Sequence, residues 1–151
     1  MIKWIGLFVL VPAICSAQAT SIDPKGLDWN NTKAANILSN VTIGISIGLD
    51  TWDSWKSVDK KRAFIKQGER TIIILGVTEV TKRLTHRTRP DNSDDLSFFS
   101  EHTEFASMNR RWIISIPLMS STGYLRIAAN KHYLTDVIVG GVVGSLVNRI
   151  R

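Results

Sequence analysis

The strongest constraint on the fold is a series of long uncharged stretches in which apolar residues recur at helical spacing. Residues 34–49 and 112–125 carry no charged side chain, and residues 60–85 place their apolar residues at a helical rather than an alternating period. None of these stretches reaches the roughly 18 apolar residues of a confident membrane span. We therefore expect an all-α protein that is soluble or lies at a membrane surface, rather than an integral one.

The stretches are divided into separate helices by prolines, glycines and polar segments. Helices are predicted over residues 34–49, 60–85, 100–110, 112–125 and 132–147. Pro90 stops the second helix, and residues 91–95 form a polar loop. Pro117 and Gly123 kink or interrupt the fourth helix. Residues 50–59 are expected to form a loop or a short amphipathic turn.

Pairs of glycines indicate where helices meet. Gly44 and Gly48 are spaced four residues apart, where a neighbouring helix could approach closely, although plain core packing is the favoured explanation. Gly140 and Gly144 lie on one face of the last predicted helix. The uncharged stretch over residues 34–49 is accordingly expected to be buried. A chain of 151 residues has room for one domain and too little for two. We predict a single-domain helical bundle of about five or six helices.

The N-terminus has the three parts of a secretory signal peptide. A basic start is followed by an apolar run over residues 4–14 and by small residues over 16–19. We expect cleavage after Ala19, with Ala17 as the alternative, and export to the periplasm or to the non-cytoplasmic side of a membrane. The only cysteine, Cys15, lies in the segment to be removed, so the mature chain should hold no disulfide and no cysteine metal site.

The mature chain is expected to have two parts. Residues 20–32, which include a proline, a glycine and an Asn-Asn pair, should form an irregular N-terminal arm. Residues 33–151 should form the helical domain. No internal repeat is present in either part.

Basic residues and histidines stand beside the apolar helices at three places. In chain order they are Lys82 with Arg89-Pro90, then Ser100 with His102, then Arg126 with His132 and Asp136. Each place alone has a plain structural explanation, such as a solvated helix end or a basic loop. The order and spacing of the three groups together say more about function than any one group alone.

This pattern resembles the type 2 phosphatidic acid phosphatase superfamily, which includes bacterial class A acid phosphatases and vanadium haloperoxidases. The pattern of that superfamily is Lys-x6-Arg-Pro, then Pro-Ser-Gly-His, then Ser-Arg-x5-His-x3-Asp, and eight positions of this chain match it in order. A chance match occurs about once in twenty at each position, so coincidence is a poor explanation. Phe99, Glu101 and Leu125 depart from the pattern, which has Pro, Gly and Ser at these positions.

The matched residue types suit phosphoryl transfer. A phosphoryl group in transfer spreads negative charge over its oxygens, so it needs fixed cations and hydrogen-bond donors. Lys82, Arg89 and Arg126 can supply the charge, and Ser100 can supply a hydroxyl donor. An arginine fork binds two oxygens at once. No metal and no other cofactor is implied, because three histidines with few nearby carboxylates form no zinc-binding pattern.

The resemblance also implies roles for the histidines. His132 would be the nucleophile that becomes phosphorylated, and Asp136, four residues further along the predicted helix, would orient its ring. His102 would protonate the leaving oxygen and then activate water. The implied reaction is metal-independent hydrolysis of a phosphomonoester. A lipid phosphate is the preferred substrate, with Trp52 and Trp55 as interfacial aromatics, and a small soluble phosphate ester is the second choice.

Two other classes of function compete with this interpretation. A nucleic-acid-binding module would explain the net charge of +6, but the chain has no such motif, and its basic residues cluster around the histidines. A catalytically weakened relative could bind phosphate headgroups or have a structural role at a membrane. Glu101 supports that alternative, because a carboxylate repels phosphate where a glycine would let the backbone approach it. The expected partners are a phosphorylated lipid or small phosphate ester and a membrane surface, without nucleic acid.

Overall fold

Helices make up most of the described part of the chain. The computed structural model describes residues 32–109 and 111–149, so the predicted signal peptide and nearly all of the predicted arm lie outside it. Its helices are α2 (Thr32–Lys56), α3 (Lys60–Thr85), α4 (Glu101–Ser107), α5 (Trp112–Ala128) and α6 (Leu134–Asn148). No strand occurs in these ranges. The prediction of an all-α, single-domain bundle is confirmed.

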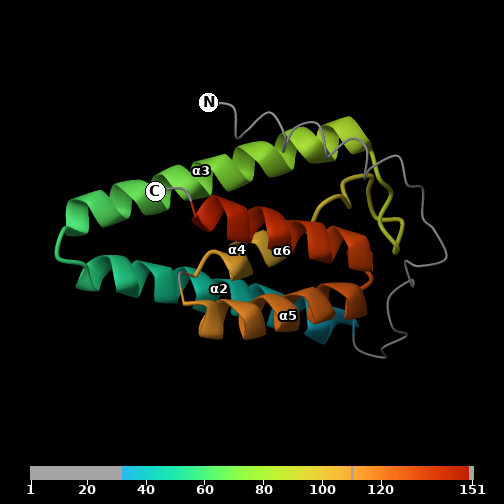
Figure 1. Cartoon of the computed structure of the whole chain (residues 1–151). Coiled ribbons are helices and arrows are strands. Elements are labelled where there is room, and N and C mark those ends of the chain that lie inside the picture. The colour runs from blue at the N-terminus through green and yellow to red at the C-terminus, as the bar shows by residue number, and fades with distance from the viewer. Residues whose placement is uncertain (1–31, 110, 150–151) are drawn as a thin grey trace.

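The short helix α4 lies at the centre of the bundle. It contacts each of the other four described helices. α2 and α5 lie on one side of it, while α6 and then α3 lie on the other side (Figure 1). None of the described helices combines the length and the apolar character of a membrane span.

Close approach to α4 depends on the glycines of α6. A Cβ atom on Gly140 would lie 2.5 Å from the carbonyl oxygen of Ser100, and one on Gly144 would collide with the backbone of Glu104. Gly140 and Gly144 therefore mark the contact between α6 and α4. Gly44 and Gly48 mark no close approach of a neighbouring helix, because outside their own helix backbone no atom lies within 4 Å of a Cβ built on either.

The ends of α3 agree with the predicted range. Asp59 caps the N-terminus by accepting a hydrogen bond of 3.0 Å from the Arg62 backbone N–H. His86 ends the helix in the left-handed conformation, with φ of 45°, and its N–H bonds to the Lys82 carbonyl. The chain thus leaves the helix four residues before Pro90, and residues 91–95 form the expected polar loop.

Two predictions about α2 are wrong. Residues 50–56, expected in a loop, continue the helix to Lys56. The uncharged stretch is not buried either, since α2 lies at the edge of the bundle and packs through one side, with Ala35, Ser39 and Ser46. Its other side faces outward. The apolar character of residues 34–49 could not show whether another helix packs against the outward side of α2.

The boundaries of α5 and α6 also differ from expectation. α5 is one helix that passes through Pro117 and Gly123 without interruption and ends at Ala128. α6 begins at Leu134, so His132 lies before the helix rather than in it. Tyr133 is the N-cap residue of α6 in an extended conformation. This shift changes the way in which His132 and Asp136 face each other.

The main apolar core holds the segment that enters α4. Phe98 and Phe99 are fully buried and pack with Ile74, Val143 and Val147. Their rings meet edge to face, with centroids 5.6 Å apart. Phe99, one of the three departures from the superfamily pattern, is therefore a core residue that fixes the start of α4.

Candidate active site

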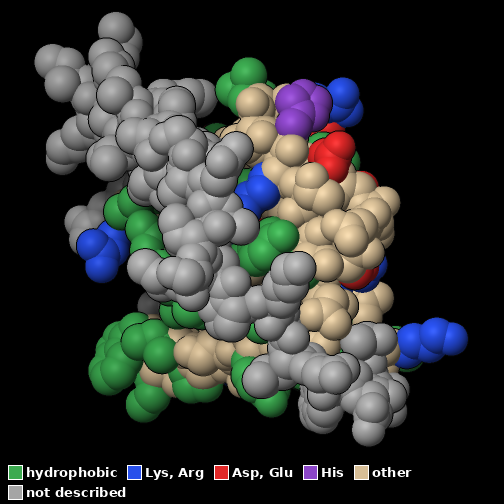
Figure 2. Space-filling model, turned by 90° about the vertical axis from the view of Figure 1, so that its right-hand side faces the viewer, with side chains coloured by type: hydrophobic (Ala, Val, Ile, Leu, Met, Phe, Trp, Pro, Cys, Tyr) green, Lys and Arg blue, Asp and Glu red, His purple; other side chains and the backbone are tan. Residues whose placement is uncertain are grey.

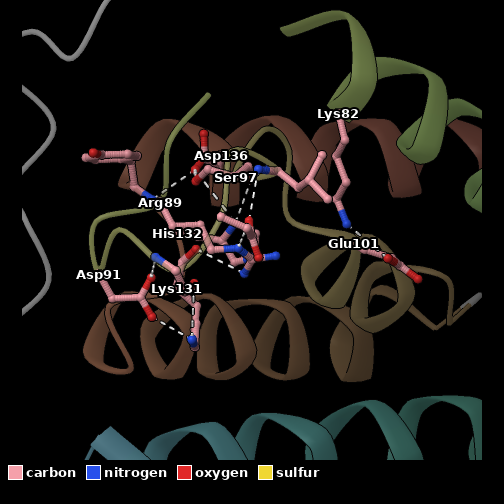
Figure 3. Close-up of polar contacts among 12 residues, drawn as sticks. Lys82, Arg89, Asp91, Ser97, Glu101, Lys131, His132 and Asp136 are labelled. Atoms are coloured by element: carbon pink, nitrogen blue, oxygen red, sulfur yellow. Dashed lines mark hydrogen bonds and ion pairs between the residues drawn. The ribbon is translucent and has the colours of Figure 1, made fainter. Parts of the chain in front are cut away.

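Two loops meet at one end of the bundle and bring the predicted site residues together. The loop between α3 and α4 is tied to the segment before α6 by a backbone hydrogen bond of 3.1 Å from Asp91 to Asn130, and to the first turn of α6 by one of 3.0 Å from Ser100 to Asp136. The Arg89 Nη1 atom adds a bond of 3.4 Å to the Lys131 carbonyl. The matched segments, far apart in sequence, therefore share one region (Figure 3).

His132 lies in this region with its ring almost fully buried. Its Nδ1 atom is 2.7 Å from the Ser97 carbonyl oxygen, which can only accept, so Nδ1 carries the proton. Nε2 is then the unprotonated nitrogen, as a nucleophile requires. Asp136 Oδ2 is 3.7 Å from Nδ1, which permits electrostatic attraction but is too long for a hydrogen bond. The orientation expected from Asp136 is thus provided by the Ser97 carbonyl.

Asp136 is fully buried, and both of its carboxylate oxygens accept hydrogen bonds from groups other than His132. Its Oδ1 accepts from Arg87 Nη1 at 2.6 Å. Its Oδ2 accepts from the Ser97 hydroxyl at 2.5 Å and from the Tyr133 backbone N–H at 3.0 Å. The Arg87 guanidinium also lies over the Tyr133 ring, 4.3 Å from its centroid. Asp136 therefore fastens both loops to the first turn of α6, where the helix dipole favours a carboxylate.

His102 is held by a residue of α2. Its Nε2 lies 2.9 Å from the Oδ1 atom of Asn40. The pKa of His102 is lowered to about 3, chiefly by burial and in addition by the positive charges of Arg126, Lys82 and Arg89. His102 is thus neutral at pH 7 and is surrounded by the predicted cations.

Arg126 reaches the same region from the last turn of α5. Its Nη1 donates to the Asn36 side-chain oxygen at 2.7 Å and to the Ser39 hydroxyl at 3.4 Å. Burial and the nearby Arg89 lower its pKa to about 10, so it remains charged at neutral pH. Its buried Nε has no hydrogen-bond partner among the described residues. A buried cation with an unused donor is suited to binding an anion.

The other two predicted cations are paired with carboxylates. Lys82 Nζ lies 3.2 Å from Glu101 Oε2, and Arg89 Nε lies 2.5 Å from Asp94 Oδ1. Glu101, the departure of greatest chemical consequence, is therefore paired with one of the predicted phosphate-binding cations and remains partly exposed. An incoming phosphate would compete with this carboxylate for Lys82.

Ser100 is fully buried at the N-cap position of α4. Its hydroxyl oxygen accepts a bond of 3.0 Å from the Thr103 hydroxyl. Its backbone N–H is bonded to the Asp136 carbonyl. Ser100 therefore lies where the loop between α3 and α4 meets the first turn of α6.

Several residues of this region escaped the sequence analysis. Arg87 and Ser97 hold Asp136 but match no position of the pattern, and Asn36 and Asn40 lie on α2, far from any motif. Glu104 is fully buried behind the site, bonded to the Thr78 hydroxyl, and burial raises the pKa of its carboxyl well above the usual range. The Arg-Thr-Arg-Pro segment at residues 87–90 was visible in the sequence, but nothing local distinguished Arg87 from a solvated cation.

Across residues 32–109 and 111–149, no three His, Cys, Asp or Glu side chains are grouped closely enough to hold a metal ion. No protein-family model, curated protein or solved structure matches the chain.

Burial of His132 in the neutral form makes folding depend on pH. Its pKa is lowered to about 4, chiefly by burial, from 6.5 in the unfolded chain. Between these values the unfolded chain binds more protons, so the contribution of His132 to stability is present above pH 6.5 and is lost as the pH falls through this window. His132→Gln should therefore gain stability relative to wild type by up to about 1.4 kcal/mol per pH unit below pH 6.5.

Urea denaturation of both proteins between pH 7 and 4.5 measures this change. The comparison cancels the opposite pH dependence of Glu104, whose raised pKa is common to both chains. A stability difference that stays constant over this range would show that His132 is not buried in the neutral form.

Proposed function

We propose that this protein is a metal-independent phosphomonoester hydrolase that acts through a phosphohistidine and is related to the type 2 phosphatidic acid phosphatases. The supporting observation is the gathering of two neutral histidines among Lys82, Arg89 and Arg126, all of which contribute to lowering the pKa of His102. Such a site offers a nucleophile and fixed positive charge for a phosphoryl group.

In the first step, His132 Nε2 would attack phosphorus. A P–N bond forms as the bond between phosphorus and the leaving oxygen breaks. The Ser97 carbonyl keeps Nδ1 protonated during the attack, and the Asp136 carboxylate, 3.7 Å away, stabilises the positive ring of the intermediate. Arg126 and the other cations stabilise the charge on the equatorial oxygens.

His102 would act at the leaving oxygen. A neutral imidazole cannot donate a proton to it as a general acid, but a bound phosphate dianion offsets the charges of Arg126, Lys82 and Arg89 that lower the His102 pKa. Substrate binding would thus raise the pKa of His102, so that the ring is protonated and can act as the general acid. Once His102 has lost the proton, it can activate the water that hydrolyses the P–N bond.

A lipid phosphate is the favoured substrate. A groove of about 610 Å³ runs between α5 and α6 and is lined largely by apolar side chains, among them Tyr124, Ile138 and Val142. It includes Ile127 and Leu134, which lie next to Arg126 and close to His132 in the chain. An alkyl chain in this groove would lie along α5 and α6, the helices that carry Arg126 and Asp136. A small soluble phosphate ester is the alternative substrate.

A phosphatase assay tests the proposal directly. The purified chain should hydrolyse para-nitrophenyl phosphate and dispersed phosphatidic acid in excess chelator, and vanadate should inhibit both reactions. Brief reaction with a ³²P-labelled substrate should leave acid-labile, base-stable label on the protein. Absence of both activities would favour the second candidate function, a weakened relative that binds phosphate headgroups, which the Lys82–Glu101 ion pair supports.

Glu101→Gln removes the carboxylate that competes with phosphate for Lys82. We expect KM to fall by about tenfold at low salt, because a charged competitor is lost, and the gain should shrink at 0.5 M salt as the charges are screened. Initial rates at both salt concentrations measure this effect. Glu79→Gln is the matched control, since Glu79 pairs with the exposed Arg83 on α3. Loss of activity in Glu101→Gln would instead assign the carboxylate a positive role.

A further inference from the structure

The outer sides of α2 and α5 form a continuous apolar surface, here called the α2–α5 face. On α2, apolar side chains face outward along one stripe. The members of the face are Leu38, Val41, Ile45, Trp52 and Trp55 of α2, and Trp112, Ile113, Ile116 and Tyr124 of α5. Each is between 47% and 73% exposed, which is unusual for so many large apolar side chains on neighbouring helices.

The two helices present these side chains on the same side of the molecule. They lie antiparallel, joined by bonds from Arg126 to Asn36 and from Thr122 to Thr42 of 2.7 and 2.8 Å, and by the Arg111–Asp53 ion pair at the other end. Figure 2 shows hydrophobic side chains gathered at the lower left of the molecule. A partner would therefore contact both helices together.

The charges around this face are mainly basic. Lys33 and Lys56 lie at the two ends of α2, with Lys60 at the start of α3, and all three are exposed. The acidic residues of α2 are turned elsewhere, since Asp50 is buried against Arg70 and Asp53 pairs with Arg111. The surroundings of the face thus complement an anionic surface.

Tryptophan and lysine side chains are paired at one end of the face. The Lys56 ammonium lies 4.7 Å from the Trp52 ring centroid, and the Lys60 ammonium lies 4.7 Å from that of Trp55. Tryptophan rings settle at the level of lipid headgroups, and lysines beside them extend their charge toward the phosphates. A second copy of the chain on this face would bring like charges at the ends of α2 together.

We infer that the α2–α5 face docks on an anionic phospholipid bilayer. The role of this docking rests on the proposed function, because docking would bring a lipid phosphate to the site. Asn36 and Asn40 of α2 contact Arg126 and His102, while Leu38 and Val41 of the same turns lie in the face. The site is therefore next to one end of the docking surface, where headgroups would lie.

Site-directed spin labelling tests the inference at individual positions. Ile45→Cys and Ile116→Cys, each in a Cys15→Ser background, would carry a nitroxide in the α2–α5 face. Ile72→Cys is the matched control, because Ile72 is 71% exposed on α3, away from this face. Collision rates with oxygen and with a water-soluble nickel complex are measured with and without vesicles of phosphatidylglycerol and phosphatidylcholine.

Vesicles should lower nickel collisions at positions 45 and 116 by about fivefold and raise oxygen collisions, as for groups at the headgroup and acyl boundary. Position 72 should not change. Equal nickel access at all three positions, or protection at position 45 without vesicles, would overturn the inference, the latter in favour of a second copy. Both lipids are phosphodiesters, so docking is measured independently of hydrolysis, and para-nitrophenyl phosphate turnover tests the proposed function separately.

Discussion

His132→Ala is expected to reduce kcat by about four orders of magnitude or more, to the level left by binding and charge stabilisation alone. The physical reason is that the variant has no nitrogen to form the P–N bond. Turnover of para-nitrophenyl phosphate and trapping of the ³²P-labelled intermediate measure the loss. The fold should persist, because the variant loses one neutral hydrogen bond, to the Ser97 carbonyl, which costs about 1–3 kcal/mol.

His86→Asn is the matched control. His86 is exposed and matches no superfamily position, and asparagine tolerates its left-handed backbone conformation. Activity close to wild type is expected for this variant. A His132→Ala protein that keeps a tenth or more of wild-type turnover would exclude His132 as the nucleophile.

Asp136→Asn should damage both stability and turnover. The two carboxylate oxygens accept from Arg87, Ser97 and Tyr133, so an amide NH₂ would face at least one of these donors at a fully buried position. Arg87 also loses a charge partner. We expect stability to fall by about 3–5 kcal/mol, and kcat to fall by about 10²- to 10⁴-fold. Urea denaturation and kcat, both at pH 7, measure the two effects.

Asp53→Asn provides the control for an ion pair outside the site. Asp53 pairs with Arg111, whose side chain is 55% exposed, so the change should cost less than about 1 kcal/mol and leave kcat unaltered. An Asp136→Asn protein with wild-type stability would contradict the buried network. One that is destabilised but fully active would show that the network supports the fold without assisting His132.

The sequence by itself determined the class of fold and most of the helices. Helix formation depends on hydrogen bonds and side-chain contacts over three or four residues, so it leaves a local pattern, and residues 60–85 are helical over the range that this pattern indicates. The placement of Gly140 and Gly144 on one helix face was also visible in the sequence. The motif residues could also be selected from sequence, because residue identity and spacing define them.

The sequence could not decide which side of α2 is covered. Leu38, Val41 and Ile45 have the same spacing whether another helix of the chain packs against them or they stay on the surface of the bundle. The residues expected in a loop, 50–56, remain helical because Asp50 bonds to Arg70 of α3 and Asp53 to Arg111 near α5. These partners lie far along the chain.

The tertiary structure alone decided how the candidate site is held. Asp136 was expected to orient His132 from one turn away, but α6 begins after His132, and the Ser97 carbonyl accepts the hydrogen bond from Nδ1. Asp136 instead binds Arg87 and the Ser97 hydroxyl, 49 and 39 residues distant in sequence. Local spacing could nominate the charged residues, but their partners depend on the path of the loops, which is set by the packing of Phe98 and Phe99 and by the glycines of α6.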